Sequence, residues 1–378
     1  MKTSFAQIVA RQEQIRKTKI EDKIPGWSSA KGLEFPSDLS LEQCSSEKAA
    51  EYKASTASSL FNDPSEKILW DLTGGLGVDS WAFSRCFGKV VYNERNELLF
   101  EAVKNNFNAL GIDNVDFFCS DAEEMALPHN PDIIFLDPAR RDDMGKKVFL
   151  VEDCRPDVLA LLPALFEKVQ YVVVKLSPMA DISMLAGRFG GHLRQIHIVA
   201  LEGECKELLC ILSKSVAEAY DIIVKELSDG AELVYKSTGK SVAAYGDAAP
   251  GDWLWEPRAP LMKAGCFSLI CERYAVAALH PSTHLYAAAV PAPSSLFKSF
   301  LVIDSFDFGK AGFKAAGEKY PCAEVTARNI PMTSQELKKR LGVKSGADYH
   351  IFGCLTQSGR KLLVTKVSHH SDRAQSAQ

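Results

Sequence analysis

The stretch DLTGGLGVDSWAFS, residues 71–84, decides how this sequence folds. An apolar run ends at Leu72, breaks into the glycines Gly74, Gly75 and Gly77, and continues with helical spacing. A glycine-rich turn between a strand and a helix lets a ligand approach the backbone, and the start of the helix favours negative charge. The pattern therefore predicts a strand, a ligand-binding turn and a helix.

Two phosphate-binding patterns fit this turn poorly. A phosphate-binding P-loop needs a Lys followed by Ser or Thr, but Val78, Asp79 and Ser80 follow Gly77. A dinucleotide-binding turn needs a third glycine where Ser80 stands. The flanking Asp71 and Asp79 disfavour a pyrophosphate and favour a ligand that bears an ammonium group, by charge complementarity.

Apolar strands alternate with amphipathic helices on both sides of this turn. The predicted strands are KILWDLT, KVVYNE, VDFFCSD, PDIIFLDP and YVVVKLSP, and the predicted helices are VDSWAFSRCF, ELLFEAVKNNFNALG, PDVLALLPALFEKV and DISMLAGRFG. Such alternation indicates a parallel sheet covered on both faces. IHIVALEGE and KELLCILSK are joined so closely that they must be antiparallel, so the sheet is expected to end in a hairpin.

The flanking regions predict smaller units of an α/β protein. Residues 1–55 have a helical pattern, and residues 56–225 form the Rossmann-like sheet domain. Residues 226–293 and 294–370 read as two small α+β modules, with a linker around Pro291 and Pro293. In the last module Thr333 and Glu336 predict a capped helix, and a hairpin turns at residues 357–359.

Composition indicates a soluble protein of the reducing cytoplasm. The 378 residues carry a net charge of −4, and no stretch is long and apolar enough for a signal peptide or a membrane span. The ten cysteines are scattered, several of them within apolar runs, which suits free thiols. Cys266, Cys271, His280 and His284 lack the usual zinc-ligand spacing, and AGCFSLICERYAVAALH reads as an apolar helix, so no metal site is expected.

The turn DLTGGLGVD resembles motif I of class I S-adenosylmethionine-dependent methyltransferases, and further resemblances follow it in order. Glu94 matches the acidic residue that bonds the ribose hydroxyls in that family, and Asp121, with Ala122 beside the ring, matches the one that bonds the adenine amino group. Asp137, Pro138, Ala139 and Arg140 match motif IV, which faces the methyl group and the acceptor. A single Asp after a strand is usually only a cap, but four acidic strand ends in register indicate a cofactor crevice.

The resemblance and the positions of the strand ends together indicate two sets of residues around this crevice. The expected cofactor S-adenosylmethionine would contact Asp71, Thr73, Gly74, Gly75, Gly77, Asp79, Glu94, Asp121, Ala122 and Asp137. The expected transfer site comprises Asp137, Pro138, Arg140 and Lys175, with Asp137 as the proton acceptor. Lys175 and Ser177 follow the fifth strand, although Lys175 could equally extend its ammonium to solvent from the strand end.

Motif IV departs from the enzymes that methylate base amino groups. Ala139 stands where those enzymes have a second proline, and Arg140 stands where they have an aromatic residue. Adenine or cytosine amino methylation is therefore disfavoured. Arg140 and Arg141 are expected either to hold a phosphate or base or to pair with Asp142 or Asp143.

The whole chain also resembles a bacterial group of methyltransferases that carry a ferredoxin-like insert and a C-terminal THUMP-like domain. The resemblance is carried by LEQCSSEKAAEYKA, DLTGGLGVDSW, FLDPARRD, VKLSPMADI, WEPRAPLMKAG, HPSTHLY and ARNIPMTSQELKKRLGVKSGADYHIFG. Because THUMP domains are associated with RNA, the resemblance implies an RNA substrate. The lack of a long apolar run indicates no membrane partner, and the sequence leaves the oligomeric partner open.

Charge offers a second indication of RNA. Residues 296–366 contain twelve Lys or Arg and six Asp or Glu, whereas the whole chain is acidic. The expected phosphate contacts are Arg141, Lys338, Lys339, Arg340 and Lys344. The cluster at 338–344 is equally compatible with the solvated face of an amphipathic helix. Two alternative functions also stay open, namely methylation of a protein or small molecule, and an inactive RNA-binding protein of the same fold.

Overall fold

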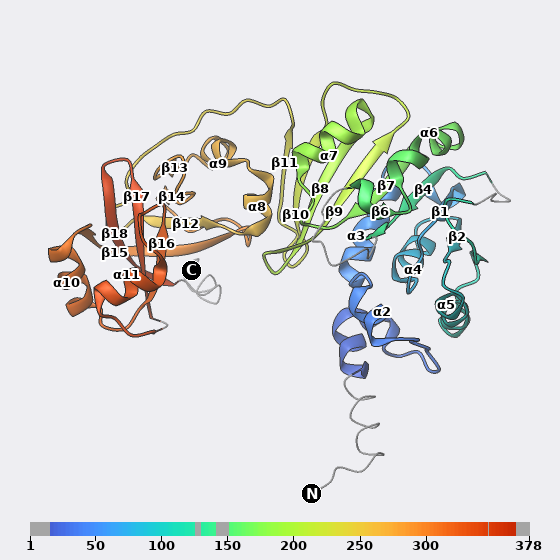
Figure 1. Ribbon diagram of the computed structural model, residues 1–378, viewed down its shortest axis with the longest axis horizontal. Helices are drawn as coiled ribbons and strands as arrows, with labels where there is room; N and C mark the ends of the chain where they lie inside the picture. The colour runs from blue at the N-terminus through green and yellow to red at the C-terminus, as the bar shows by residue number, and fades with distance from the viewer. Residues whose placement is uncertain (1–15, 125–129, 141–150, 347, 368–378) are drawn as a thin grey trace, which may run out of the picture. The chain divides into compact units, whose positions relative to one another are not determined.

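The computed structural model describes residues 16–124, 130–140, 151–346 and 348–367 (Figure 1). The chain divides into two compact units. The first comprises residues 1–199, 206–223 and 234–237, and the second comprises residues 200–205, 224–233 and 238–378. Arg141, one of the expected RNA contacts, lies outside the described residues.

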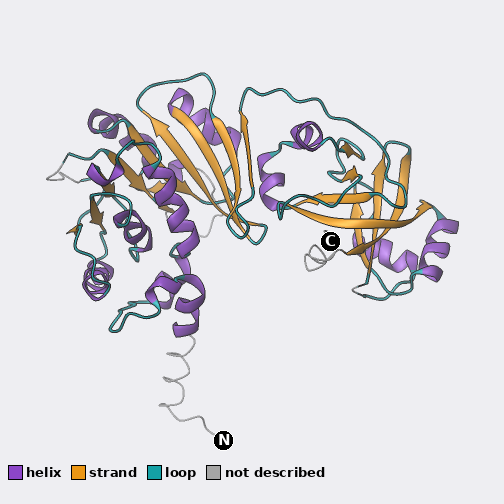
Figure 2. Ribbon diagram, turned by 180° about the vertical axis from the view of Figure 1, so that it is seen from behind, coloured by secondary structure: helices purple, strands orange, loops and turns teal. Residues whose placement is uncertain are grey.

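A nine-stranded sheet dominates the first part of the chain, with helices flanking its strands (Figure 2). Its order is β11-β10-β8-β9-β7-β4-β1-β2-β3. The strands are β1 (Ile68–Asp71), β2 (Lys89–Asn93), β3 (Val115–Phe118), β4 (Ile133–Leu136), β7 (Tyr171–Leu176), β8 (Leu193–Leu201), β9 (Glu204–Ser213), β10 (Asp221–Glu226) and β11 (Glu232–Lys236). β3, β2, β1, β4 and β7 pair in parallel, which confirms the predicted parallel sheet.

The predicted antiparallel hairpin is also confirmed. β9 runs antiparallel to β7, with Val174 opposite Cys210, and it lies between β7 and β8 in the sheet. Glu202 and Gly203 connect β8 to β9 with φ values of 58° and 81°, as the tightest hairpin turns require. The sheet does not end there, however, because β10 and β11 extend it beyond β8. The short strand candidate AELVYKS therefore belongs to this sheet.

The helices of the first unit begin where the sequence supplies a cap. They are α2 (Asp38–Gln43), α3 (Glu47–Ser58), α4 (Val78–Ser84), α5 (Glu97–Ala109), α6 (Val158–Lys168) and α7 (Ile182–Phe189). Side chains of the preceding residue accept a backbone N–H at five of these starts: Ser37, Ser46, Asn96, Asp157 and Asp181. α4 instead starts from Gly77 in the left-handed conformation. The helix expected through Ala54 is therefore α3, and it packs against α4.

A seven-stranded sheet forms the centre of the second unit, in the order β13-β14-β12-β15-β18-β17-β16. The strands are β12 (Trp253–Pro257), β13 (Ala277–Ala278), β14 (Tyr286–Ala288), β15 (Phe297–Asp307), β16 (Glu324–Arg328), β17 (Tyr349–Thr356) and β18 (Gly359–Val367). β12 pairs with β15, so the two expected α+β modules share one continuous sheet.

The helices of the second unit include one difference from expectation. The predicted apolar helix over AGCFSLICERYAVAALH is instead α9 (Phe267–Tyr274), preceded by α8 (Ala259–Ala264). Gly265 and Ala275, with φ values of 65° and 52°, end these two helices in the left-handed conformation. The chain then enters β13, which pairs with β14.

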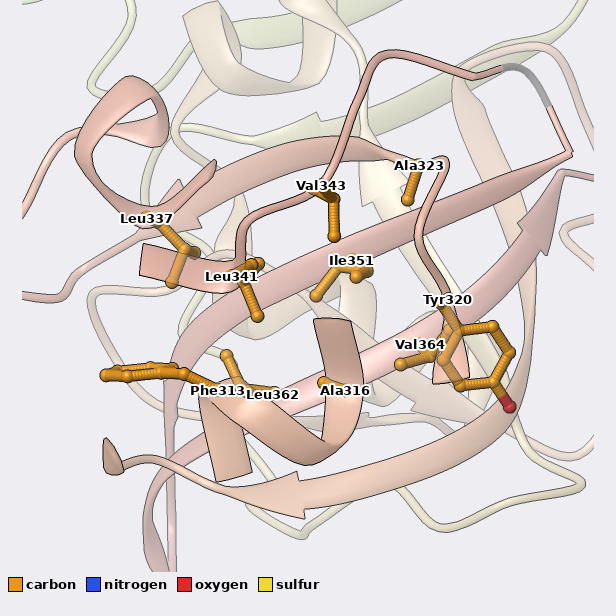
Figure 3. Close-up of a cluster of buried hydrophobic side chains, with 10 residues drawn as sticks. All are labelled: Phe313, Ala316, Tyr320, Ala323, Leu337, Leu341, Val343, Ile351, Leu362 and Val364. Atoms are coloured by element: carbon orange, nitrogen blue, oxygen red, sulfur yellow. The ribbon is translucent and has the colours of Figure 1, made fainter. Parts of the chain in front are cut away.

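α10 (Lys310–Lys319) and α11 (Ser334–Leu341) cover one part of this sheet. Figure 3 shows Phe313, Leu337 and Leu341 from these helices gathered with Ile351 and Leu362 of the strands in one buried cluster. The predicted cap is confirmed, because the Thr333 side chain accepts the N–H of Glu336 and the Glu336 side chain accepts the N–H of Thr333. Within the described part of the chain, no helix has the length and apolar character needed to span a bilayer.

Candidate functional site

The glycine turn is held in one conformation by its neighbours. A Cβ on Gly74 would lie 2.1 Å from the ring of Tyr92, and one on Gly77 would lie 2.7 Å from Val103, so neither position accepts a side chain without rearrangement. Gly77 also has a φ of 80°. The Tyr92 hydroxyl donates to the carbonyl of Gly75 at 2.7 Å. These contacts fix the backbone of the turn after β1, residues 73–77, which is called the cradle below.

Asp71, at the end of β1, faces the interior of the protein. The Ser80 hydroxyl donates to one carboxylate oxygen at 2.5 Å, and the N–H of Thr73 donates to the other at 3.1 Å. The residue is completely buried, and this burial raises its pKa to about 8. Asp71 thus connects the strand end to the first turn of α4, and its side chain shapes the cradle from within.

Glu94 follows β2 and lies directly against the cradle. The N–H of Gly75 donates to one of its carboxylate oxygens at 3.0 Å, and the N–H of Asn96 donates to the other at 2.8 Å. The side chain is half-buried. A carboxylate can accept about four hydrogen bonds, so Glu94 keeps acceptor capacity for the hydroxyl groups of a ligand. The structure brings this predicted residue and the glycine turn together.

Asn93 is a site residue that the sequence pattern did not identify. Its amide nitrogen donates to the carbonyls of Leu72 and Ser120 at 3.1 and 3.0 Å, and its amide oxygen accepts from the N–H of Ser120 at 3.1 Å. Asn93 therefore fastens the ends of β1, β2 and β3 to one another. The signal for it is a polar residue at the end of the otherwise apolar strand KVVYN.

Asp121 and Ala122 lie in the turn after β3, and both are half-buried. One carboxylate oxygen of Asp121 accepts from the N–H of Glu123 at 3.0 Å. The turn places Asp121 just beyond Ser120, which Asn93 ties to the end of β2. Asp121 and Glu94 are thus at neighbouring strand ends.

Asp137 follows β4 and is the centre of the expected transfer site. Its N–H donates to the Thr73 hydroxyl at 2.6 Å, which joins the segment after β4 to the glycine turn. The Lys175 ammonium, on β7, donates to its carboxylate at 2.7 Å. Burial disfavours the charge of Lys175, but the adjacent Asp137 raises the pKa of this lysine above its usual value. The two residues form a partly buried ion pair on neighbouring strands.

The remaining residues of the expected transfer site continue from Asp137. Pro138 is buried. Ala139 and Arg140 form the short strand β5 (Ala139–Arg140), which pairs with β6 (Cys154–Arg155). The segment after Asp137 is therefore extended along a second short strand and does not turn back into the main sheet.

A buried charge cluster next to this site also escaped prediction from the sequence. Lys53 of α3 pairs with Asp79 of α4 at 2.9 Å and with Glu207 of β9 at 3.0 Å. Ser45, before α3, donates to the second Asp79 oxygen at 2.9 Å. Lys53 lies in a polar helix and has the sequence context of an ordinary exposed lysine, and Glu207 is 154 positions away along the chain. The sequence does not show that Lys53 lies on the buried face of α3.

The basic residues of the last module lie on and after α11. Lys339, Arg340 and Lys344 are exposed, and half-buried Lys338 donates to the Ser345 hydroxyl. Arg340 also lines a groove of about 620 Å³ between α10 and α11, together with Lys310, Phe313, Lys314, Gly317, Glu318, Leu341 and Gly342. The groove has three cationic side chains and one anionic one. Within the second unit, this surface offers a place for phosphate groups.

The cysteines and histidines between residues 266 and 284 have other contacts in the structure. Cys266 and Cys271 are buried, and His284 stacks on Phe267 with ring centroids 3.8 Å apart. In residues 16–124, 130–140, 151–346 and 348–367, no group of three or more His, Cys, Asp or Glu side chains is arranged to hold a metal ion.

The chain is similar to two known domain families and to solved structures. Residues 253–294 match the family described as a ferredoxin-like domain, and residues 297–366 match the family described as THUMP domain-like. A solved structure from Porphyromonas gingivalis W83, provisionally described as a methyltransferase, is 28% identical with a TM-score of 0.80, covering 98% of this chain and 92% of that one. Among curated proteins, none matches the chain.

Two further solved structures match over about half of the chain. One is a Pyrococcus horikoshii protein provisionally described as an RNA methyltransferase, 18% identical with a TM-score of 0.36, covering 53% of this chain and 100% of that one. The other is a tRNA methyltransferase of Aquifex aeolicus, 15% identical with a TM-score of 0.35, covering 49% of this chain and 74% of that one.

Proposed function

We propose that this chain, which combines a Rossmann-like methyltransferase fold with a ferredoxin-like domain and a THUMP-like domain, transfers the methyl group of S-adenosylmethionine to RNA. The observation that carries the proposal is the meeting of the glycine cradle with Glu94 on one side and Asp137 on the other. The N–H of Gly75 bonds Glu94, and the hydroxyl of Thr73 bonds the N–H of Asp137.

The residues around the cradle suit such a donor. Gly74 and Gly77 let the turn pack closely against Tyr92 and Val103, whereas a Cβ on Gly75 would face open space, so the backbone at Gly75 is accessible to a ligand. Glu94 has acceptor capacity for ribose hydroxyls, and Asp121 has it for an exocyclic amino group. Asp79, in the first turn of α4, offers a carboxylate to an ammonium group. When bound, S-adenosylmethionine supplies an electrophilic methyl group.

The residues of the chain then position the reacting groups and accept a proton. Lys175 orients the Asp137 carboxylate, and Thr73 fixes the backbone of the same residue. Asp137 accepts the proton that the acceptor atom loses as it gains the methyl group. Pro138 and Arg140 follow Asp137 along the chain and are assigned to the acceptor side by the motif that they share with it. Holding donor and acceptor in line supplies most of the rate.

The THUMP-like domain and its charge support RNA as the acceptor. Lys310, Lys314 and Arg340 line the groove between α10 and α11, and Lys339 and Lys344 are exposed nearby in sequence. Phosphate contacts of this kind provide much of the affinity for nucleic acids. The segment 296–366 also carries the positive balance of an otherwise acidic chain.

Calorimetry tests the donor half of the proposal. The wild type is expected to bind S-adenosylmethionine, and Glu94→Ala combined with Asp121→Ala is expected to weaken binding at least about tenfold, because charge-assisted hydrogen bonds are lost. Glu97→Ala is the control, since Glu97 is an exposed carboxylate in the first turn of α5. No binding by the wild type, or unchanged binding by the double variant, contradicts the proposal.

A further inference from the structure

Lys53 occupies an unusual position for a lysine. It projects from α3, and its side chain is completely buried, with exposed fractions of 0% for Lys53, 11% for Asp79 and 4% for Glu207. Its ammonium lies 2.9 Å from Asp79, 3.0 Å from Glu207 and 2.7 Å from the Ser45 hydroxyl. An ammonium has three N–H donors. All three have a partner within the protein, so Lys53 has no donor left for a ligand.

Burying these charged side chains costs free energy, because the charges lose their hydration. Burial opposes the charge of Lys53, and its two carboxylate partners raise the pKa of this lysine. Burial also raises the pKa of Glu207, against the opposing effect of Lys53. Among the described residues, Glu207 Oε1 is buried without a hydrogen-bond partner. Well-packed apolar residues commonly stabilise a fold as much as a buried ion pair does. The stability of the fold therefore does not explain why this buried charge cluster is present, which points to a role in function.

Asp79 connects the cluster to the cradle. It stands two residues after Gly77, in the first turn of α4. One of its oxygens is paired with Lys53 and the other accepts from Ser45, so both contacts that fix its direction come from the N-terminal segment. A carboxylate in this state still has unused lone pairs. The direction of Asp79 therefore depends on how α3 is docked.

We propose that Lys53 and Glu207 are positioning residues of the donor site, which hold the Asp79 carboxylate toward the ammonium group of the donor's amino-acid tail. This inference rests on the proposed function. It gives the N-terminal helical segment a part in the site, since α3 supplies the cation and the loop before it supplies Ser45. The expected effect is confined to the amino-acid tail, because Glu94 and Asp121 contact the adenosine.

A charge-matched variant separates positioning from simple electrostatics. Lys53→Met alone leaves two buried carboxylates without a cation and is expected to unfold more easily. Lys53→Met with Glu207→Gln removes one positive and one negative charge, so the formal charge of the cluster is unchanged. A change in net charge is therefore not the cause of any loss of donor affinity in this double variant.

The experiment measures the affinity of the full-length chain for two ligands by calorimetry. S-adenosylmethionine has the amino-acid tail, and 5′-methylthioadenosine has the adenosine and the sulfur but no tail. The double variant is expected to bind S-adenosylmethionine about tenfold more weakly and to bind 5′-methylthioadenosine within twofold of the wild type. Arg85→Met is the control, because Arg85 forms an exposed ion pair with Glu51 between the same two helices, at 2.9 Å.

The outcomes are distinguishable. Wild-type protein that binds neither ligand contradicts the proposed function itself. A double variant that keeps the wild-type ratio of the two affinities overturns the positioning role and leaves the proposed function standing. Ser45→Ala, which changes no charge, covers the case in which the double variant does not fold, and it is expected to lower the same ratio about threefold through loss of one hydrogen bond. An unchanged ratio in Ser45→Ala also overturns the inference.

Discussion

The Lys175 ammonium lies 2.7 Å from a carboxylate oxygen of Asp137, across the neighbouring parallel strands β7 and β4. We expect Asp137→Asn to lower the rate of methyl transfer to RNA at least about 100-fold, because a proton acceptor contributes that much or more. Donor affinity should stay within threefold, since the donor is held mainly by the cradle and Glu94. Transfer of labelled methyl groups to RNA from a strain that lacks the gene measures the rate.

Lys175→Met should also slow transfer, because Asp137 loses the group that orients it. Lys67→Met is the matched control, since Lys67 lies just before β1 and forms a more exposed ion pair with Asp132 at 3.2 Å. If both substitutions slow methyl transfer equally, the ion pair of Lys175 with Asp137 has no specific role in the transfer.

The Thr73 hydroxyl provides a second test of the link between the cradle and the transfer site. Thr73→Val removes the acceptor of the Asp137 N–H and should lower kcat about tenfold through misplacement of the reacting groups. Thr73→Ser keeps the hydroxyl and should restore kcat. Steady-state kinetics decides this, and a Ser variant as slow as the Val variant speaks against the hydrogen bond as the cause.

The pair of half-buried Tyr52 and buried His197 predicts how stability depends on pH. The Tyr52 hydroxyl lies 2.6 Å from Nδ1 of His197, and burial lowers the pKa of this histidine to about 4. The unfolded chain has a histidine pKa near 6.5, so it binds more protons below that pH. Stability is therefore lost as the pH falls from about 6.5 toward 4.

The contribution of His197 should fall by about 2 kcal/mol between pH 7.5 and pH 5. Chemical denaturation of the wild type and His197→Gln at both pH values isolates it, because other titrating groups, including Asp71, are common to both proteins. If the difference in free energy of unfolding between the two proteins is the same at both pH values, His197 is not held in its neutral form.

The groove between α10 and α11 predicts the salt dependence of RNA binding. Replacing Arg340 and Lys339 with Gln should weaken RNA binding at every salt concentration. The slope of log affinity against log salt should become shallower by about one for each phosphate that the variant no longer neutralises. Lys361→Gln is the control within the same unit, because Lys361 is paired with Asp307 at 2.7 Å. Filter binding over a salt series measures both quantities, and an unchanged slope excludes this surface.

The sequence predicted those parts of the site that follow from local pattern. Asp71, Glu94, Asp121 and Asp137 each come directly after an apolar strand, and parallel strands bring their carboxyl ends to one edge of a sheet. In the structure, Asp71, Glu94 and Asp137 each form a hydrogen bond with Thr73 or Gly75 of the cradle. The hairpin of β8 and β9 was predictable for a similar reason, since a two-residue connection permits only antiparallel pairing.

Interactions between distant segments were not predictable in this way. Lys53 lies in a polar helix, and its burial depends on Glu207, which belongs to a strand far along the chain. β11 was assigned to the next module because the sequence pattern changes after about Glu226, and its pairing with β10 in the first sheet is not visible in the sequence. The helix expected from Ala264 to His280 ends at Tyr274, because Ala275 adopts a left-handed conformation, which an alanine rarely does and which its sequence therefore does not indicate.

Mass spectrometry of modified nucleosides tests the central claim most directly. RNA from cells with and without the gene is digested to nucleosides, and the deletion strain is complemented with the wild type or with Asp137→Asn. The account predicts that one methylated nucleoside is missing from the deletion strain, returns with the wild type and does not return with Asp137→Asn. Identical nucleoside profiles in all four strains would contradict it.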